Sequence, residues 1–313
     1  MPNSINYRIF NTIAVFVLFI LFLAAPGNAG TVRQQVFDSP EGAVKVLIDA
    51  TERNDIKQLS AVFGPKWQDL LLSGEEGADN KSRERFLQAY KEGSKLEYQR
   101  KGKVILTLGN DNWPFPVPIV KKGKSWHFDT RAGREEIVNR KIGRNELSVI
   151  EAMKAYVDAQ KDYFSRTRNS DGVHEFAKKI VSEKGKKDGL YWEIKDSEEQ
   201  SPLGPFYAAA AREGYTPDRG DKKPVPYHGY YFKILTAQGK HAPGGAYDYI
   251  INKHMIFGFA LIAYPAKYGS SGVKTFLINQ QGIVYERDLG KNTEQAAAAL
   301  KNYDPDKKWQ VIK

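Results

Sequence analysis

The chain of 313 residues contains no cysteine. This absence excludes a disulfide framework, a lipid anchor on cysteine, thiol nucleophiles and thiolate metal sites. An exported chain of this kind must be stable through its hydrophobic core alone. The hydrophobic content of 41% and the length of the chain permit such a core.

Histidine is scarce as well. The five histidines are His127, His174, His228, His241 and His254. No two of them form a compact ligand pair such as His-Glu-x-x-His. A loop could bring His241, Asp248 and His254 together, but solvated loop histidines are the simpler interpretation. We therefore expect neither a metal site nor a cofactor.

A complete hydrolase signature is also missing. Gly269-Ser-Ser-Gly272 does not match the Gly-x-Ser-x-Gly elbow. Ser271-Gly-Val-Lys274 matches Ser-x-x-Lys, but it enters a predicted strand where penicillin-binding enzymes place a helix. One enzymatic alternative stays open, a hydrolase or transferase of cell-envelope polymers with His228 as general base and Asp248 as its orienting acid. A protein without catalytic residues is the favoured interpretation.

An apolar segment lies near the N-terminus. Arg8 precedes an unbroken apolar run over residues 13–25, which is followed by Pro26-Gly-Asn-Ala29. This order is typical of a secretory signal peptide, and we predict cleavage after Ala29 that removes residues 1–29. The alternative is an uncleaved anchor helix, which is disfavoured because the run is shorter than the ~20 residues that span a bilayer. The mature chain is expected to be periplasmic or extracellular.

The sequence has 47 basic and 37 acidic residues, a formal net charge of +10. Such a balance favours anionic partners. For an exported protein these would be an anionic envelope polymer, lipid headgroups or an acidic envelope protein, and the location disfavours nucleic acid. A solvated basic surface that keeps the protein soluble is the alternative. Membrane contact is expected only through an uncleaved leader.

Residues 30–140 are predicted to form an N-terminal α+β domain. Ser39-Pro40 and Asp55 are helix starts because each supplies a capping oxygen. A polar loop over residues 73–80 precedes a short helix around residue 90. Extended patterns then predict strands over residues 95–99, 104–108, 117–120 and 126–128. Over residues 37–129, this order resembles the cone-shaped fold of the nuclear-transport-factor-2-like superfamily.

A second unit is predicted over residues 141–292. Apolar residues at helical spacing indicate a half-buried helix over residues 145–164. It should pack on a sheet whose strands are expected at residues 230–236, 255–264, 274–278 and 283–287. A helix at residues 293–300 and a charged tail are expected to complete the chain as a separate segment, residues 293–313.

Several motifs of the second unit occur in the order Asn145-Glu146, Gly229-Tyr-Tyr-Phe232, Ala263-Tyr-Pro265, Tyr268-Gly269 and Gly272-Val273. This order is similar to the globular part of type II secretion pseudopilins and type IV pilin-like proteins, in which a spine helix packs on an antiparallel sheet. The apolar half of the spine helix is missing here. The resemblance therefore implies a role beside such an assembly, as a partner of a pilin-like or secretion component.

Seven motifs carry a resemblance that covers nearly the whole mature chain. They are Asp111-Asn-Trp-Pro-Phe-Pro-Val-Pro118, Gly133-Arg-Glu-Glu-Ile137, Ile142-Gly-Arg-Asn-Glu-Leu147, Gly189-Leu-Tyr-Trp192, Ser201-Pro-Leu-Gly-Pro205, Tyr227-His-Gly-Tyr-Tyr-Phe232 and Pro243-Gly-Gly-Ala246. In these motifs the sequence resembles the exported bacterial proteins of domain-of-unknown-function family 2950. The resemblance implies export but no defined activity.

Aromatic residues are the candidate ligand-binding residues. Trp113 and Phe115 stand on a stiff proline frame, where a core strand is disfavoured. Others crowd the edges of the second sheet, namely Tyr227, His228, Tyr230, Tyr247 and Tyr249. Aromatic faces with polar tips suit sugar rings or peptides, and packing between the two domains is the alternative. We predict a non-catalytic envelope protein that binds a partner or assists assembly.

Overall fold

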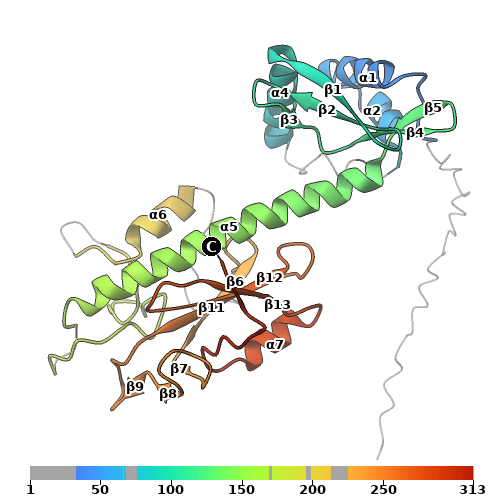
Figure 1. Cartoon of the computed structure of the whole chain (residues 1–313). Helices are drawn as coiled ribbons and strands as arrows, with labels where there is room; N and C mark the ends of the chain where they lie inside the picture. The colour runs from blue at the N-terminus through green and yellow to red at the C-terminus, as the bar shows by residue number, and fades with distance from the viewer. Residues whose placement is uncertain are drawn as a thin grey trace, which may run out of the picture.

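The computed structural model describes residues 33–65, 67, 76–168, 171–194, 199–212 and 225–312. The predicted signal peptide, residues 1–29, lies outside these residues. The described chain is an α+β protein, as predicted. Its two larger sheets are antiparallel, and one long helix runs between them (Figure 1).

Residues 33–128 form the N-terminal part of the structure. Its elements are α1 (Pro40–Glu52), α2 (Ile56–Phe63), α4 (Glu76–Glu92), β1 (Ser94–Gln99), β2 (Lys103–Leu108), β3 (Trp113–Pro114), β4 (Ile119–Lys122) and β5 (Ser125–Phe128). The sheet order is β1-β2-β4-β5, and β3 also pairs with β2. The helices share one hydrophobic cluster with the sheet, in which Leu47 and Phe63 meet Leu106 and Phe128.

Both predicted helix starts are confirmed. The Ser39 and Asp55 side chains accept hydrogen bonds from the amides of Gly42 and Gln58, at 3.1 and 2.9 Å. By contrast, α4 begins at Glu76, within the predicted polar loop. Its first ten residues carry almost no apolar side chain, so no helical periodicity reveals them in the sequence.

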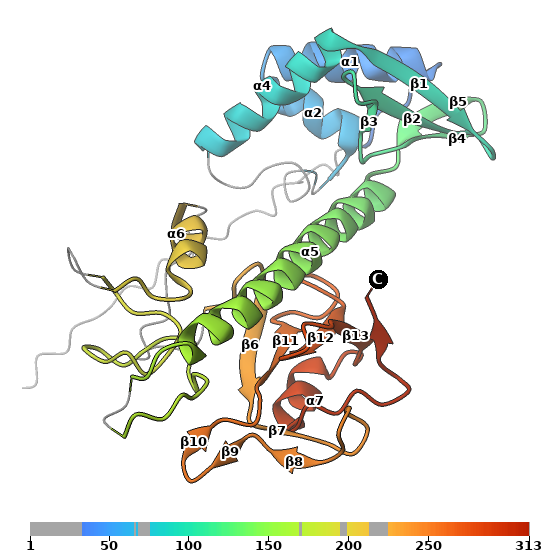
Figure 2. The same ribbon diagram turned by 60° about the vertical axis from the view of Figure 1, so that its left-hand side comes forward.

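The helix α5 (Thr130–Phe164) is a single helix of 35 residues that leaves the N-terminal part and crosses the C-terminal sheet (Figure 2). Asp129 caps it by accepting a 3.0 Å hydrogen bond from the Ala132 amide. The prediction placed its start at residue 145, which is too late, because about half of the preceding helical residues are charged and they show no continuous apolar face. Neither α5 nor any other helix among the described residues is long and apolar enough to cross a membrane.

The C-terminal part contains the second sheet. Its strands are β6 (Tyr230–Leu235), β7 (Ala237–Gln238), β8 (Tyr247–Asp248), β9 (Ile250–Ile251), β10 (His254–Met255), β11 (Ala260–Pro265), β12 (Lys274–Asn279), β13 (Tyr285–Asp288) and β14 (Gln310–Val311), and its short helices are α6 (Gly204–Arg212) and α7 (Thr293–Ala299). The main sheet has the order β14-β13-β12-β11-β6. α5 lies on one face, where the Tyr156 hydroxyl donates to the Ala260 carbonyl oxygen of β11 at 3.5 Å. Lys233 of β6 donates to the Ala297 carbonyl oxygen of α7 at 2.9 Å, and α7 lies on the other face (Figure 2).

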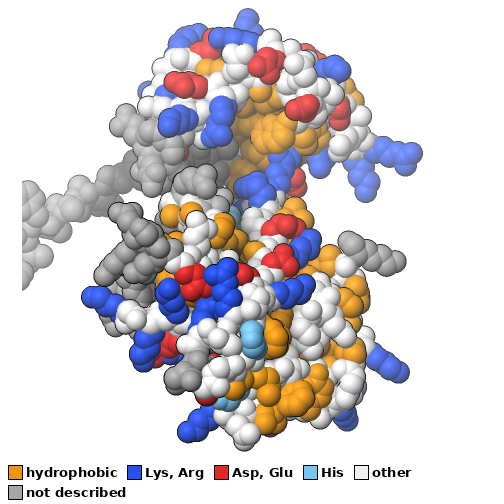
Figure 3. Space-filling model, turned by 90° about the vertical axis from the view of Figure 1, so that its left-hand side faces the viewer, with side chains coloured by type: hydrophobic (Ala, Val, Ile, Leu, Met, Phe, Trp, Pro, Cys, Tyr) orange, Lys and Arg blue, Asp and Glu red, His pale blue; other side chains and the backbone are white. Residues whose placement is uncertain are grey.

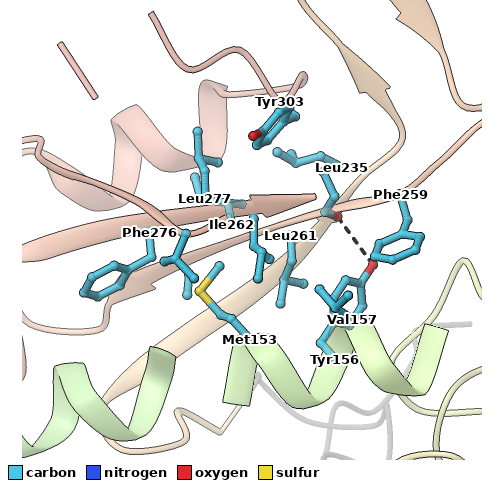
Figure 4. Packing of buried hydrophobic residues seen from close by; sticks show 14 of the residues in the cluster. Met153, Tyr156, Val157, Leu235, Phe259, Leu261, Ile262, Phe276, Leu277 and Tyr303 are labelled. Carbon is cyan, nitrogen blue, oxygen red and sulfur yellow. Dashed lines mark hydrogen bonds between the residues drawn. The ribbon is translucent and has the colours of Figure 1, made fainter. Parts of the chain in front are cut away.

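The core of the C-terminal part is formed by both faces of this sheet. Met153 and Tyr156 of α5 point toward Leu261 and Phe276 of the sheet (Figure 4). Tyr303 and Trp309 are buried in the same cluster, and β14 pairs with β13. Residues 293–312 are therefore part of this core in the structure, although the sequence suggested a separate charged tail.

Candidate functional site

Two sets of contacts hold α5 against the rest of the chain, and we call them the first and second joints. The first joint connects α5 to β3. The guanidinium carbon of Arg140 lies 5.1 Å from the centroid of the Trp113 ring, and Nη1 donates a 2.8 Å hydrogen bond to the Pro114 carbonyl oxygen. Glu136, one turn earlier, accepts from Arg140 Nε at 2.7 Å. Trp113 is 48% exposed, but its contact with Arg140 gives it a role in holding the helix, through a cation–π interaction.

The first turns of α5 also lie against the N-terminal part. Thr130 Oγ1 donates a 2.6 Å hydrogen bond to the Phe63 carbonyl oxygen. Gly133 is so close to Val117 that an added Cβ would lie 2.7 Å from a valine methyl carbon. This position of the helix therefore requires glycine, which fixes the direction in which α5 leaves the sheet.

Phe115 was predicted to face a ligand, and this prediction is wrong. Its backbone amide donates to the Leu106 carbonyl oxygen at 2.7 Å, which holds it against β2. Its ring is buried, with centroids 5.4 Å from Phe86 and 6.5 Å from Phe128. The proline frame thus directs this ring into the core.

The second joint connects α5 to the C-terminal sheet through Glu146. Its Oε1 accepts hydrogen bonds from the backbone amides of Val273 and Lys274, both at 2.9 Å. The hydroxyl of Tyr230 lies 3.3 Å from the same oxygen and 2.9 Å from the Lys274 carbonyl oxygen. Burial, and secondly the Glu146 carboxylate, raise the pKa of Tyr230, so this hydroxyl stays a neutral donor. Asn145 adds a 2.8 Å hydrogen bond from Nδ2 to the Ser271 carbonyl oxygen.

Two glycines allow the close approach at this joint. A Cβ on Gly272 would lie 2.0 Å from the Tyr230 hydroxyl oxygen, and a Cβ on Gly229 would lie 2.6 Å from Ser271 Cβ. Gly229 also has a φ of +71°, which disfavours other residues. The second joint therefore packs together three segments that are far apart in the sequence, around residues 146, 229 and 272.

The remaining aromatic candidates occupy different positions. Tyr230 and Tyr249 are fully buried, so the prediction that they contact a ligand is wrong. The hydroxyl of each is used inside the protein, that of Tyr249 by a 3.1 Å hydrogen bond to Gln238 Oε1. Tyr227 and His228 are half-buried, with ring centroids 4.4 Å apart, and Tyr247 is exposed. The predicted aromatic set does not form one surface.

The proposed base and acid are not brought together. His228 precedes β6, whereas Asp248 pairs with Ala237 beyond the other end of this strand. The six residues of β6 separate them by roughly 15–20 Å, at ~3.3 Å per residue. The pair His228–Asp248 is therefore not formed, and the enzymatic alternative loses its two named residues.

The residues of the suggested metal and Ser-x-x-Lys sites are also dispersed. His241 Nδ1 lies 3.0 Å from an Asp304 oxygen, and His254 contacts two other carboxylates. Lys274 Nζ lies 3.0 Å from Glu286, and Ser271 Oγ accepts from the Lys267 amide at 2.9 Å. Within the described ranges, no cluster of three or more potential metal ligands has the geometry of a site.

An exposed apolar surface lies at the opposite end of the C-terminal part from the joint. Four side chains around the buried Tyr249 form it, and we call it the β8–β10 surface: Tyr247, Ile251, Ile256 and Phe257, which are 36–57% exposed. The amides of Ile256 and Phe257 both donate to the Tyr249 carbonyl oxygen, at 3.0 and 3.2 Å, which turns these two residues outward. Figure 3 shows hydrophobic side chains gathered at this lower end of the molecule. This surface differs from the sequence prediction, in which residues 255–264 form one buried strand.

An open hollow of about 430 Å³ lies between the first part of α5 and the β11–β12 loop. Arg134, Glu135, Val138 and Asn139 of α5 line it together with Gly269. Its lining combines charged and amide side chains with apolar surface, and its open form provides no enclosed environment for a small molecule.

The described residues form an α+β protein in which one long helix, α5, contacts both larger sheets. The chain belongs to the family of proteins of unknown function DUF2950, whose family model matches residues 34–312. No curated protein and no solved structure matches the chain. The pilin-like and nuclear-transport-factor-2-like resemblances therefore remain predictions.

Several sequence motifs of the family resemblance coincide with the two joints. The motifs that begin at Asp111 and Gly133 meet at the first joint, and those that begin at Ile142 and Tyr227 meet at the second. These motifs thus fix the geometry of the chain on α5.

Proposed function

We propose that this protein is an exported, non-catalytic adaptor of the cell envelope, in which two modules on α5 present the β8–β10 surface to a partner protein. The observation that carries the proposal is the exposure of Phe257, 57%, beside two exposed isoleucines. Contiguous exposed apolar side chains mark interaction surfaces in soluble proteins. The predicted leader over residues 1–29 supports the proposed exported location.

The chemistry of the β8–β10 surface favours a protein over a polysaccharide as its partner. Ile251, Ile256 and Phe257 offer no hydrogen-bonding group to sugar hydroxyls, whereas aliphatic and aromatic side chains form the centre of protein interfaces. The partner is expected to be an envelope protein with a complementary apolar surface.

The layout of the C-terminal part supports a role beside a pilin-like or secretion assembly. A long helix covers one face of an antiparallel sheet, as in the globular part of pilin-like proteins. The N-terminal half of α5 is occupied by the first joint, at Gly133 and Arg140, so it is not free to enter a bundle of spine helices. An accessory role is therefore favoured over that of a pilus subunit.

The proposal is tested by crosslinking and affinity capture from solubilised envelope with the mature chain as bait. The variants are Ile251→Ser and Phe257→Ser, and the matched control is Ile283→Ser, which changes an apolar residue that is 40% exposed elsewhere. We expect one envelope protein to be recovered by the wild type and the control and lost by both surface variants. Equal recovery by all four chains would refute the role of this surface.

A further inference from the structure

Two turns of the N-terminal sheet lie against each other. The β1–β2 turn contains Lys101 and Gly102, and the β4–β5 turn follows Lys121 and Lys122. The Lys121 amide donates a 2.8 Å hydrogen bond to the Gly102 carbonyl oxygen. A Cβ on Gly102 would lie 3.0 Å from Lys121 Cβ. The two turns therefore form one continuous tip, which we call the twin turns.

The twin turns carry a dense positive charge. Their six cationic side chains are all exposed: Arg100, Lys101, Lys103, Lys121, Lys122 and Lys124. Residues 98–125 contain a single acidic residue, Asp111, which lies beyond the opposite end of β2. None of the six cations forms an ion pair within the part of the chain that the structure describes. The charge of the twin turns is thus left for an external partner.

The conformation of one turn indicates that its charge is not incidental. Lys101 has a φ of +64° and is followed by Gly102 at +65°. These two residues belong to the three-residue loop between the paired Gln99 and Lys103, and a positive φ is uncommon for residues other than glycine, asparagine and aspartate, because the side chain is strained there. Lysine at this position is unfavourable for the turn but adds a cation at the tip.

An aromatic ring beside these lysines favours a membrane as the anionic partner. Phe37 and Trp126 exchange two backbone hydrogen bonds of 2.8 and 2.7 Å, so the chain enters the sheet on the strand that follows the β4–β5 turn. Lys121 Nζ lies 5.7 Å from the Trp126 ring centroid. Convex tips that combine lysines with an aromatic ring suit a flat lipid–water interface.

We propose that the twin turns dock this protein on a bilayer surface rich in anionic phospholipids. This proposal goes beyond the adaptor function and does not depend on the β8–β10 surface. That surface lies at the opposite end of the molecule, as β8 and β9 lie at the lower left and the β4–β5 hairpin at the upper right of Figure 1. It departs from the sequence expectation that only an uncleaved leader would contact the membrane.

The test is co-sedimentation of the chain from Gly30 onward with lipid vesicles. Both hydrophobic clusters consist of residues from Phe37 onward, so this chain keeps its complete cores. The vesicles contain phosphatidylcholine alone or an equimolar mixture with phosphatidylglycerol. We expect binding to the anionic vesicles alone, and release as the salt concentration rises, because screening weakens exposed charge interactions.

A matched pair of triple variants locates the binding surface. The first is Lys121→Gln, Lys122→Gln and Lys124→Gln, and the control, with equal loss of charge, is Lys291→Gln, Lys301→Gln and Lys307→Gln, all exposed in the C-terminal part. Each lysine near an anionic surface contributes about a fivefold gain in affinity, so the first variant should lose roughly 100-fold and the control less than about twofold. Circular dichroism and thermal unfolding verify that both remain folded.

Three outcomes would overturn the proposal. One is an equal loss in both triple variants, which would mean that net charge alone attracts the chain to the vesicles. Another is the absence of binding to anionic vesicles. The third is retention on a polyphosphate resin that depends on the twin turns, without vesicle binding, which would assign the turns to a soluble anionic polymer.

Discussion

Removing the Glu146 carboxylate should detach the β11–β12 loop from α5. In Glu146→Ala, the amides of Val273 and Lys274 lose their acceptor, and the buried Tyr230 hydroxyl keeps only the Lys274 carbonyl oxygen. Hydrogen bonds to a charged group contribute ~1.5–3 kcal/mol each. The site is partly exposed, so water can replace some of this interaction. We expect the free energy of unfolding to fall by about 2–3 kcal/mol, with a few tenths recovered because alanine favours the helix.

The assay is urea unfolding followed by circular dichroism, together with amide hydrogen exchange. For a cooperative unit of this size, the expected loss corresponds to a decrease in Tm of about 5–10 °C. Glu146→Gln keeps an oxygen acceptor without its charge and should lose about half as much. Exchange of the Val273 and Lys274 amides should accelerate more than that of their neighbours, because these two donors bind the carboxylate.

Glu151→Ala is the matched control on the same helix. Glu151 is 72% exposed and forms a 3.0 Å ion pair with Lys154, and such surface pairs contribute ~0–1 kcal/mol. If Glu146→Ala costs no more than this control, and the two amides exchange as in the wild type, the second joint does not depend on the Glu146 carboxylate. The packing of Tyr230 and the glycines would then have to hold the loop alone.

Three further predictions concern α5 and one surface cluster. Gly143→Ala should stabilise the protein by about 0.5–1 kcal/mol in thermal unfolding, because the added Cβ would have no atom within 4 Å. By contrast, Gly133→Ala should destabilise the protein, because the added Cβ would clash with Val117. Arg140→Ala should cost about 1 kcal/mol and broaden the distances between spin labels on the two larger sheets; an unchanged distribution would contradict the first joint. The pKa of Glu183 is lowered to about 2 by hydrogen bonds from Lys179 and a second lysine, so the stabilisation it provides is present above its unfolded-state pKa and lost as the pH falls toward 2. An NMR titration of its carboxyl carbon that gives an ordinary pKa would refute this pairing.

Local signals in the sequence were sufficient for most of the helices and strands. Ser39 and Asp55 reveal helix starts because capping involves residues three positions apart. The start of α5 is not evident from the sequence because its first turns make few apolar contacts. Gly133 and Arg140 hold these turns instead. A charged segment with a glycine gives no helical period, so the Asp129 cap is the one local signal of this boundary.

The candidate site was less predictable because its contacts connect distant residues. Glu146 and Val273 are 127 positions apart, and no spacing rule relates them. The residues around Tyr230 in the sequence do not show whether its side chain is exposed or buried. Its burial depends on Gly272, which leaves room for the hydroxyl. Aromatic content alone therefore cannot separate a binding surface from a joint.

The two joints also determine how the proposed surfaces work together. A helix of 35 residues is roughly 50 Å long at ~1.5 Å per residue. Because Arg140 fixes one part and Glu146 the other, docking of the twin turns on a membrane would hold the β8–β10 surface well away from the lipid. Gly143 is the one glycine of α5 between these two anchors, and nothing in the described structure occupies the space of its absent side chain. A bend of α5 at Gly143 would move the β8–β10 surface relative to the twin turns without breaking the contacts of either joint. The proposed adaptor would thus keep fixed contacts at its two joints and bend only between them.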